Sequence, residues 1–473
     1  MKIRLKITAI LAATALLCAC AGNPAANGVN SPSSAPASSS QTDDTPAESR
    51  TLSIRTFGNY LFTQMDIDAF RTQHPGVTIR YDNREYENSE SVGVYIDEMQ
   101  KALAAGDAPD LFDTVGLSIA EHADWGRLAN FYELIEADED FVWGDYFESV
   151  FDAMSYRGGM YAFPLSFSFN FIAVNESFVN TQTEEFKRLE TITYPGLYAM
   201  YRDMPNTAGF NIEPHFFPDN LLFYEIGKYI NYAAGDCDFD NPDFINLFDL
   251  MKAAADAGPY DSDGMVYASN AFQPDADIAA KNVFNWHTLN DMQYFLPYEE
   301  NHFTDSKPLA DSCGRVIVRP QESYAISANS ANKELAWAFL QFIAAGQGPM
   351  AGSYLTATSG SIPIHRGFAE KCIRADITNY INNSASYVDS TGDNVSITLG
   401  GDAATHAENV WLQWDKFCQL PMTTAFWLLS QEDFDSLVAA ANAFLRGERT
   451  AAEAAADVQE QVSARLDRLP ALD

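Results

Sequence analysis

Residues 51–81 read TLSIRTFGNYLFTQMDIDAFRTQHPGVTIRY, and this stretch decides the fold class. Its first residues alternate apolar and polar, as in a strand, and residues 60–74 then carry apolar side chains at helical spacing. Pro75-Gly76 ends that helix, alternation returns at Val77, and a second helix is predicted up to Gly106. Strand, helix, strand and helix within about 60 residues indicate βαβ units and therefore an α/β fold with a mostly parallel sheet.

The sequence that precedes this stretch predicts that the protein is exported. Three cations precede an apolar run from Ile7 to Leu17, which is the pattern of a secretory signal peptide over residues 1–19. The run has about 11 residues, too few to cross ~30 Å of hydrocarbon. Leu17-Cys18-Ala19-Cys20 resembles a bacterial lipobox with Cys20 as the lipid acceptor; an ordinary cleaved signal is the alternative. We therefore expect a protein anchored by lipid to the outer face of the cytoplasmic membrane.

The amino-acid composition excludes some classes of partner for the exported chain. Residues 20–50 are rich in Ser, Pro, Ala and Asn and cannot bury a core, so they are expected to form a disordered tether behind Cys20. The formal net charge of −36 repels nucleic acid and anionic headgroups, which excludes nucleic-acid binding and leaves the lipid as the membrane attachment. Four later cysteines could be free or paired, and the sequence leaves this open: Cys237, Cys313, Cys372 and Cys418.

Later periodicity extends the α/β pattern. Residues 161–174 alternate, but Pro164 within them favours an edge or a segment crossing between parts of the sheet. Helices are predicted over residues 332–345, 433–446 and 451–468. Thr450-Ala-Ala-Glu453 has the form of a capping box that opens the last helix.

Six segments together resemble the family 1 extracellular solute-binding proteins of ABC importers, which are similar to the maltose-binding protein. They follow one another in the family's order and span roughly residues 52–468, whereas residues 180–290 depart most from the pattern. The matching segments are His74–Ile79, Leu103–Phe112 (LAAGDAPDLF), Tyr161–Pro164 with Ile172–Asn175, Tyr324–Trp337, Gly360–Pro363 and Leu420–Trp427 (LPMTTAFW).

This resemblance implies two α/β lobes joined by about three hinge crossings, with ligand bound between them. The N-terminal lobe is expected to hold residues 51–164 and 300–355, and the C-terminal lobe residues 165–299 and 356–473. It also implies a monomer that captures a carbohydrate, delivers it to the transmembrane subunits of an ABC permease, and needs no cofactor or metal. A non-sugar solute such as a peptide or polyamine is the first alternative, and a secreted glycan hydrolase is the second.

Candidate binding residues lie in loops that follow predicted strands, where α/β lobes place ligands. Sugars need flat aromatic faces for their C–H surface and polar groups for their hydroxyls. Asn59 and Tyr60 follow the first strand, Tyr86 follows the second, and Asp113 ends the third. The competing interpretation of Tyr60 is a structural aromatic at the helix start.

Three further aromatic candidates lie later in the chain. Phe169, on the crossing segment, could floor the cleft, although phenylalanines of one parity in a strand are more often core. Trp427 occupies the Phe-Trp position at which the resemblance implies a sugar-stacking ring, and Trp286 corresponds to a second such ring through a looser match. No motif of a hydrolase, metal site or phosphate loop was found to compete with this assignment.

Overall fold

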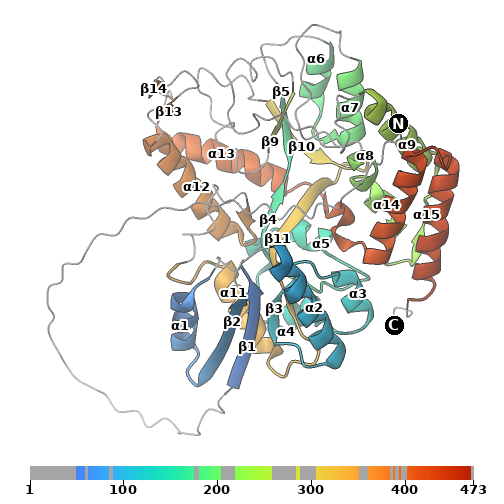
Figure 1. Ribbon diagram of the computed structural model, residues 1–473. Helices are drawn as coiled ribbons and strands as arrows, with labels where there is room; N and C mark the ends of the chain where they lie inside the picture. Colours follow the sequence, from blue (N-terminus) through green and yellow to red (C-terminus); the bar gives the residue numbers. More distant parts are fainter. Residues whose placement is uncertain are drawn as a thin grey trace, which may run out of the picture.

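The computed structural model of the chain is an α/β fold with two lobes (Figure 1). The structure describes residues 50–58, 62–84, 89–174, 181–203, 219–257, 284–287, 305–350, 361–383, 387–388, 394–395 and 402–469. The predicted signal peptide, Cys20 and the tether lie outside these residues. Among the helices that are described, none combines the length and the apolar character that a membrane span requires.

The first lobe begins with the predicted strand and helix alternation. Strand β1 pairs in parallel with both β2 and β3, and helices α1 and α2 connect them. Helix α1 starts later than the predicted residue 60, because Thr63 caps it in a reciprocal capping box with Asp66. The elements of this lobe are β1 (Arg50–Phe57), α1 (Gln64–Gln73), β2 (Val77–Arg84), α2 (Ser89–Ala105), β3 (Leu111–Asp113), α3 (Ile119–Asp124), α4 (Phe131–Ala137), η1 (Trp143–Asp145), α5 (Glu148–Ala153) and α11 (Lys333–Ala344).

Long strands run from one lobe into the other (Figure 1). Strand β11 (Val316–Ile326) lies antiparallel to β4 (Phe163–Phe169) and to β3, while β10 (Asp305–Ala310) lies antiparallel to β5 (Phe171–Val174). The short strand β12 (Ile362–Pro363) adds to β4. Pro164 therefore lies in a crossing strand, as expected. The sheet is mixed, because these crossings run against the parallel strands of the first lobe.

The second lobe packs its own core against the far ends of the crossing strands. Helices α14 and α15 form an antiparallel pair at its edge (Figure 1), and both confirm the sequence prediction, including the Thr450–Glu453 capping box. The elements here are α6 (Thr181–Arg188), β6 (Ile192–Thr193), α7 (Tyr194–Arg202), α8 (Asn220–Phe223), η2 (Ile226–Lys228), β7 (Ile230–Asn231), β8 (Asp236–Cys237), α9 (Pro242–Ala257), β9 (Phe284–His287), β15 (Met422–Thr423), η5 (Ala425–Leu428), α14 (Gln431–Leu445) and α15 (Ala451–Leu466).

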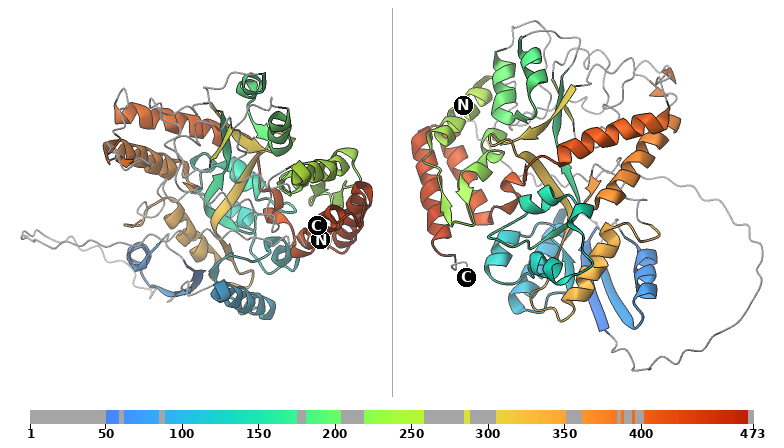
Figure 2. Two further views of the ribbon diagram at one scale, coloured as in Figure 1. Left: turned by 45° about the horizontal axis from the view of Figure 1, so that its top comes forward. Right: turned by 180° about the vertical axis from the view of Figure 1, so that it is seen from behind.

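A helical pair, α12 (Arg366–Asn383) and α13 (Ala403–Cys418), lies beside the crossing strands (Figure 2). Trp414 of α13 packs on Phe169 of β4, and the buried side chains of both helices belong to the same core as the first lobe. A hairpin of β13 (Tyr387–Val388) and β14 (Asn394–Val395) lies between the two helices in sequence. The residue bounds predicted for the two lobes stay a prediction. They are least distinct at α12 and α13, which share the core of the first lobe although the prediction assigned them to the second.

The four described cysteines are free thiols, which decides the question that the sequence left open. Cys372 and Cys418 are buried, and burial raises the pKa of both thiols. The fold is therefore held together by its packed cores and not by disulfides among these residues.

Candidate functional site

The strand register of the first lobe brings the predicted loops to one edge. Phe57 at the end of β1 lies opposite Arg84 at the end of β2, and Asp113 ends the neighbouring strand β3. Gly58 then turns the chain with φ 63°, a left-handed value that glycine adopts without strain, and its N–H donates to the Arg84 carbonyl. Asn59, Tyr60 and Tyr86 themselves lie outside the described residues. What the structure describes is that β1 and β2 end at the edge that holds Asp113.

Asp113 is a buried carboxyl group at this edge. Its side chain is 5% exposed, and Oδ1 accepts a hydrogen bond from the Val115 backbone N–H at 2.8 Å. Burial, reinforced by the charge of Glu322, raises the pKa of Asp113 to about 8. The raised pKa favours the protonated carboxyl group at neutral pH, and this form can donate a hydrogen bond as well as accept one.

Glu322 has a strained backbone beside Asp113. It lies within β11, in the segment between the pairs Gln321↔Ser166 and Ser323↔Pro164, with φ 45°. Non-glycine residues avoid this left-handed region, and where they occupy it, strain is held by the surrounding structure and is frequent at functional sites. The pairing of Tyr324 with Asp113 places this strained residue next to the end of β3.

Trp427 lies on the second lobe where the lobes meet. It belongs to the single turn η5, and its N–H donates to the Thr424 carbonyl at 3.0 Å. The Thr424 hydroxyl is bonded in turn to the Ala153 carbonyl of α5, which ties the turn to the first lobe. Trp427 is half-buried and packs against a small cluster of Ala120, Tyr156 and Leu428, against which Tyr161 and Tyr232 also pack; we call this group the aromatic cluster. Trp427 is thus anchored and partly open, as a stacking ring must be.

The other two aromatic candidates have different surroundings. Phe169 has no exposed surface and packs on Trp414 and Phe417 of α13, with ring centroids 6.0 and 6.2 Å away. A ring in this environment contributes to the core, so we leave it out of the proposed site. Trp286 lies on β9 opposite Ile172 of β5, in the second lobe, but its side chain lies outside the described residues.

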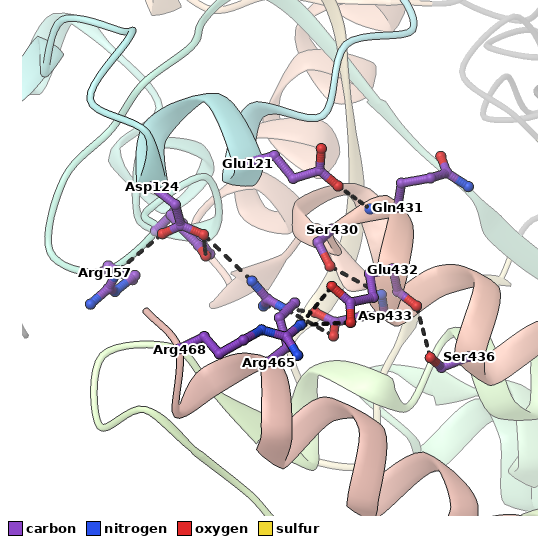
Figure 3. A network of polar contacts seen from close by, with 11 residues as sticks. Glu121, Asp124, Arg157, Ser430, Gln431, Glu432, Asp433, Ser436, Arg465 and Arg468 are labelled. Atoms are coloured by element: carbon purple, nitrogen blue, oxygen red, sulfur yellow. Dashed lines mark hydrogen bonds and ion pairs between the residues drawn. The ribbon is translucent and has the colours of Figure 1, made fainter. Parts of the chain in front are cut away.

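Sequence reasoning missed a buried charge network where the lobes touch (Figure 3). Asp124 of α3 contacts Arg465 of α15, and Arg465 also contacts Asp433 of α14. A signal existed in the sequence, because Arg465 lies on the apolar stripe of its helix with Val458 and Val462, where a cation needs a buried partner. Which acid supplies that partner depends on the tertiary fold.

Among the described residues, no group of three or more His, Cys, Asp or Glu is placed to hold a metal ion. The arrangement instead consists of polar groups at a strand-end edge of the first lobe and of an aromatic cluster to which both lobes contribute residues. Such a pairing of flat apolar rings with a few polar groups can bind a small solute.

Comparison with solved structures supports the fold. The chain is similar to the sugar-binding protein MalE of Xanthomonas citri, at 14% identity and a TM-score of 0.54, over 88% of this chain and 98% of that one. It is similar to a putative oligosaccharide periplasmic-binding protein of Synechococcus sp. MITs9220, at 15% identity and a TM-score of 0.54, over 89% of this chain and 100% of that one.

A third structure is an extracellular solute-binding protein family 1 from Alicyclobacillus acidocaldarius subsp. acidocaldarius DSM 446, at 13% identity and a TM-score of 0.51, over 89% of this chain and 100% of that one. No curated protein sequence matches the chain. The profile described as bacterial extracellular solute-binding protein matches residues 58–346, which is more than half of the chain. The chain therefore belongs to the bacterial extracellular solute-binding protein family.

Proposed function

We propose that this protein captures a carbohydrate between its lobes and delivers it to the transmembrane subunits of an ABC importer. The main support for the proposal is Trp427, a half-buried ring that lies where the lobes meet and packs against the aromatic cluster. Aromatic faces stack on the apolar C–H surface of a pyranose, and the edge that holds Asp113 offers polar groups for its hydroxyls. An oligosaccharide is the ligand we favour.

The same proposal covers how the protein is held and how it acts. It acts as a monomer, attached to the membrane by a lipid on Cys20 and separated from it by the tether of residues 20–50. It has no catalytic activity of its own, in keeping with its family. Ligand shifts the population toward closed lobes, and the closed form is the one the permease receives.

The test is a thermal-shift and calorimetric screen of residues 50–473 against oligosaccharides, amino acids, peptides and polyamines. A ligand at a hundredfold excess over its Kd stabilises the fold by about 2.7 kcal/mol. We expect stabilisation by an oligosaccharide alone. Stabilisation only by peptides or polyamines would overturn the carbohydrate assignment, and release of reducing ends from glycans would show a hydrolase instead.

A further inference from the structure

The two lobes meet through a charge network that is nearly dry. Asp124 of the first lobe and Arg465 of the second are 341 residues apart in sequence, yet Nη1 of Arg465 lies 3.4 Å from Oδ2 of Asp124. Their side chains are 7% and 6% exposed. Beside them, the backbone N–H of Gln431 donates to Glu121 of α3 at 3.1 Å, so the start of α14 is also in contact with the first lobe (Figure 3).

Each charge of this network also has a partner within its own lobe. In the first lobe, Arg157 Nη1 lies 3.0 Å from Oδ1 of Asp124, and the Tyr156 hydroxyl donates to Oδ2 at 2.9 Å. In the second lobe, Arg465 Nε donates to Asp433 Oδ1 at 2.9 Å, and Nη2 lies 2.7 Å from Oδ2, off the hydrogen-bond direction. The two negative charges of Asp124 and Asp433 are thus matched by the two positive charges of Arg157 and Arg465. Each lobe holds one ion pair with no net charge, Asp124–Arg157 in the first and Asp433–Arg465 in the second.

This division makes the contact reversible. A buried charge that loses its sole partner is strongly destabilising, which would oppose any motion that separated the lobes. Among the ion pairs of this network, separation breaks only the longer Asp124–Arg465 contact and leaves both shorter pairs in place. Moving the lobes apart at this point would therefore leave neither acid and neither arginine of these pairs without a partner. Contact between the lobes adds one ion pair, in a site from which water is largely excluded.

The backbone of the first lobe is strained at Arg157, one of the residues of this network. Arg157 has φ 51° and precedes Gly158 with φ 81°, at the tip of a hairpin closed by hydrogen bonds between Tyr156 and Gly159. This turn type requires positive φ at both central residues, and it favours Asn or Gly over arginine at the first. Arginine occupies this position although Asn or Gly would form the turn with less strain, and its guanidinium contacts Asp124.

Aromatic rings join the network to the proposed ligand site. Tyr156 of the first lobe packs on Tyr232 of the second at 4.8 Å between centroids, and the Arg465 guanidinium lies 5.7 Å from the Tyr232 ring. Trp427 packs against the same cluster. Any change in lobe separation at Asp124 and Arg465 therefore moves the surroundings of the stacking ring.

We propose that Asp124 and Arg465 are positioning residues, whose ion pair stabilises the closed arrangement of the lobes and so strengthens ligand binding without touching the ligand. This inference rests on the proposed function for its effect on affinity. Its effect on lobe separation does not, because that is a property of the protein without ligand.

The experiment measures both quantities in the full-length mature protein. Asp124→Asn removes the charge with little change in shape, and Arg465→Lys keeps a cation beside Asp433 while losing the fork that reaches both acids. Arg468→Gln is the matched control, since it breaks an exposed pair with Glu432 inside the second lobe. The readouts are the radius of gyration from small-angle X-ray scattering without ligand, the Kd for the solute found in the screen, and the melting temperature.

We expect Asp124→Asn and Arg465→Lys each to increase the radius of gyration and to raise Kd roughly five- to tenfold. Arg468→Gln should change neither. An unchanged radius and Kd in both test variants, with only a lower melting temperature, would show that the pair is merely structural and would overturn the proposal. If no carbohydrate binds but the radius still increases, the proposed ligand class fails and the role of the ion pair stands.

Discussion

The buried acid at the end of β3 makes a quantitative prediction about pH. Asp113 has its pKa raised from 3.8 to about 8 in the folded protein. Between these values the folded state holds a proton that the unfolded state has lost, so unfolding releases it and rising pH favours unfolding. The stability contribution of this proton is fully present below pH 3.8 and is lost as the pH rises through about 8.

The size of the loss follows from the shift. One pKa unit corresponds to about 1.4 kcal/mol, so the slope within the window is about 1.4 kcal/mol per pH unit and the whole loss is on the order of 6 kcal/mol. Asp113→Asn removes the titration, and its amide oxygen can still accept the hydrogen bond from the Val115 N–H. The variant should match the wild type near pH 4 and exceed it in stability above pH 8.

Urea denaturation at several pH values between 4 and 9 measures this difference. Taking the variant minus the wild type cancels the other titrating groups. Glu322→Gln is the companion variant, because it removes only the smaller, electrostatic cause and should shift the midpoint of the loss to lower pH. Parallel stability curves for wild type and Asp113→Asn would refute the reasoning and show that Asp113 is ionised when folded.

Two further predictions concern the ends of the chain. Cys20→Ala should release an intact, ligand-competent protein from the membrane fraction into the medium or periplasm and reduce solute uptake; retention in the membrane would contradict lipidation at Cys20. Thr450→Ala breaks the reciprocal capping box of α15 by removing the hydroxyl that accepts a hydrogen bond from the Glu453 backbone N–H at 3.3 Å, and should cost about 1 kcal/mol in urea unfolding. An unchanged unfolding midpoint would show that packing alone holds that helix end.

Local sequence patterns predicted much of the fold. The helices at 433–446 and 451–468 were placed closely because apolar stripes and caps are local features. The edge that holds Asp113 was also predictable, because parallel strands bring their carboxyl ends together. The raised pKa of Asp113 could not be predicted from the sequence, because it depends on burial and on the charge of Glu322. Glu322 is more than 200 residues away in sequence and is brought close by the pairing of β3 with β11.

Side-chain environments were harder to predict than positions. Phe169 and Trp427 are both aromatic candidates for the site, yet Phe169 is fully buried against α13 and Trp427 is half-buried where the lobes meet. The contact of Asp124 with Arg465 joins residues that are 341 positions apart in the sequence. Such pairings follow from how the two lobes meet, which no local pattern encodes.

The central claim is carbohydrate capture at Trp427, and isothermal titration with the oligosaccharide that most stabilises the wild type tests it directly. Trp427→Ala should raise Kd by about tenfold or more, the equivalent of about 1.4 kcal/mol, with little change in melting temperature. Trp125→Ala is the matched control, because that ring is 57% exposed and lies outside the aromatic cluster. Equal affinity in wild type and Trp427→Ala, or a lower melting temperature with unchanged affinity, would show that Trp427 is a core residue and contradict the account.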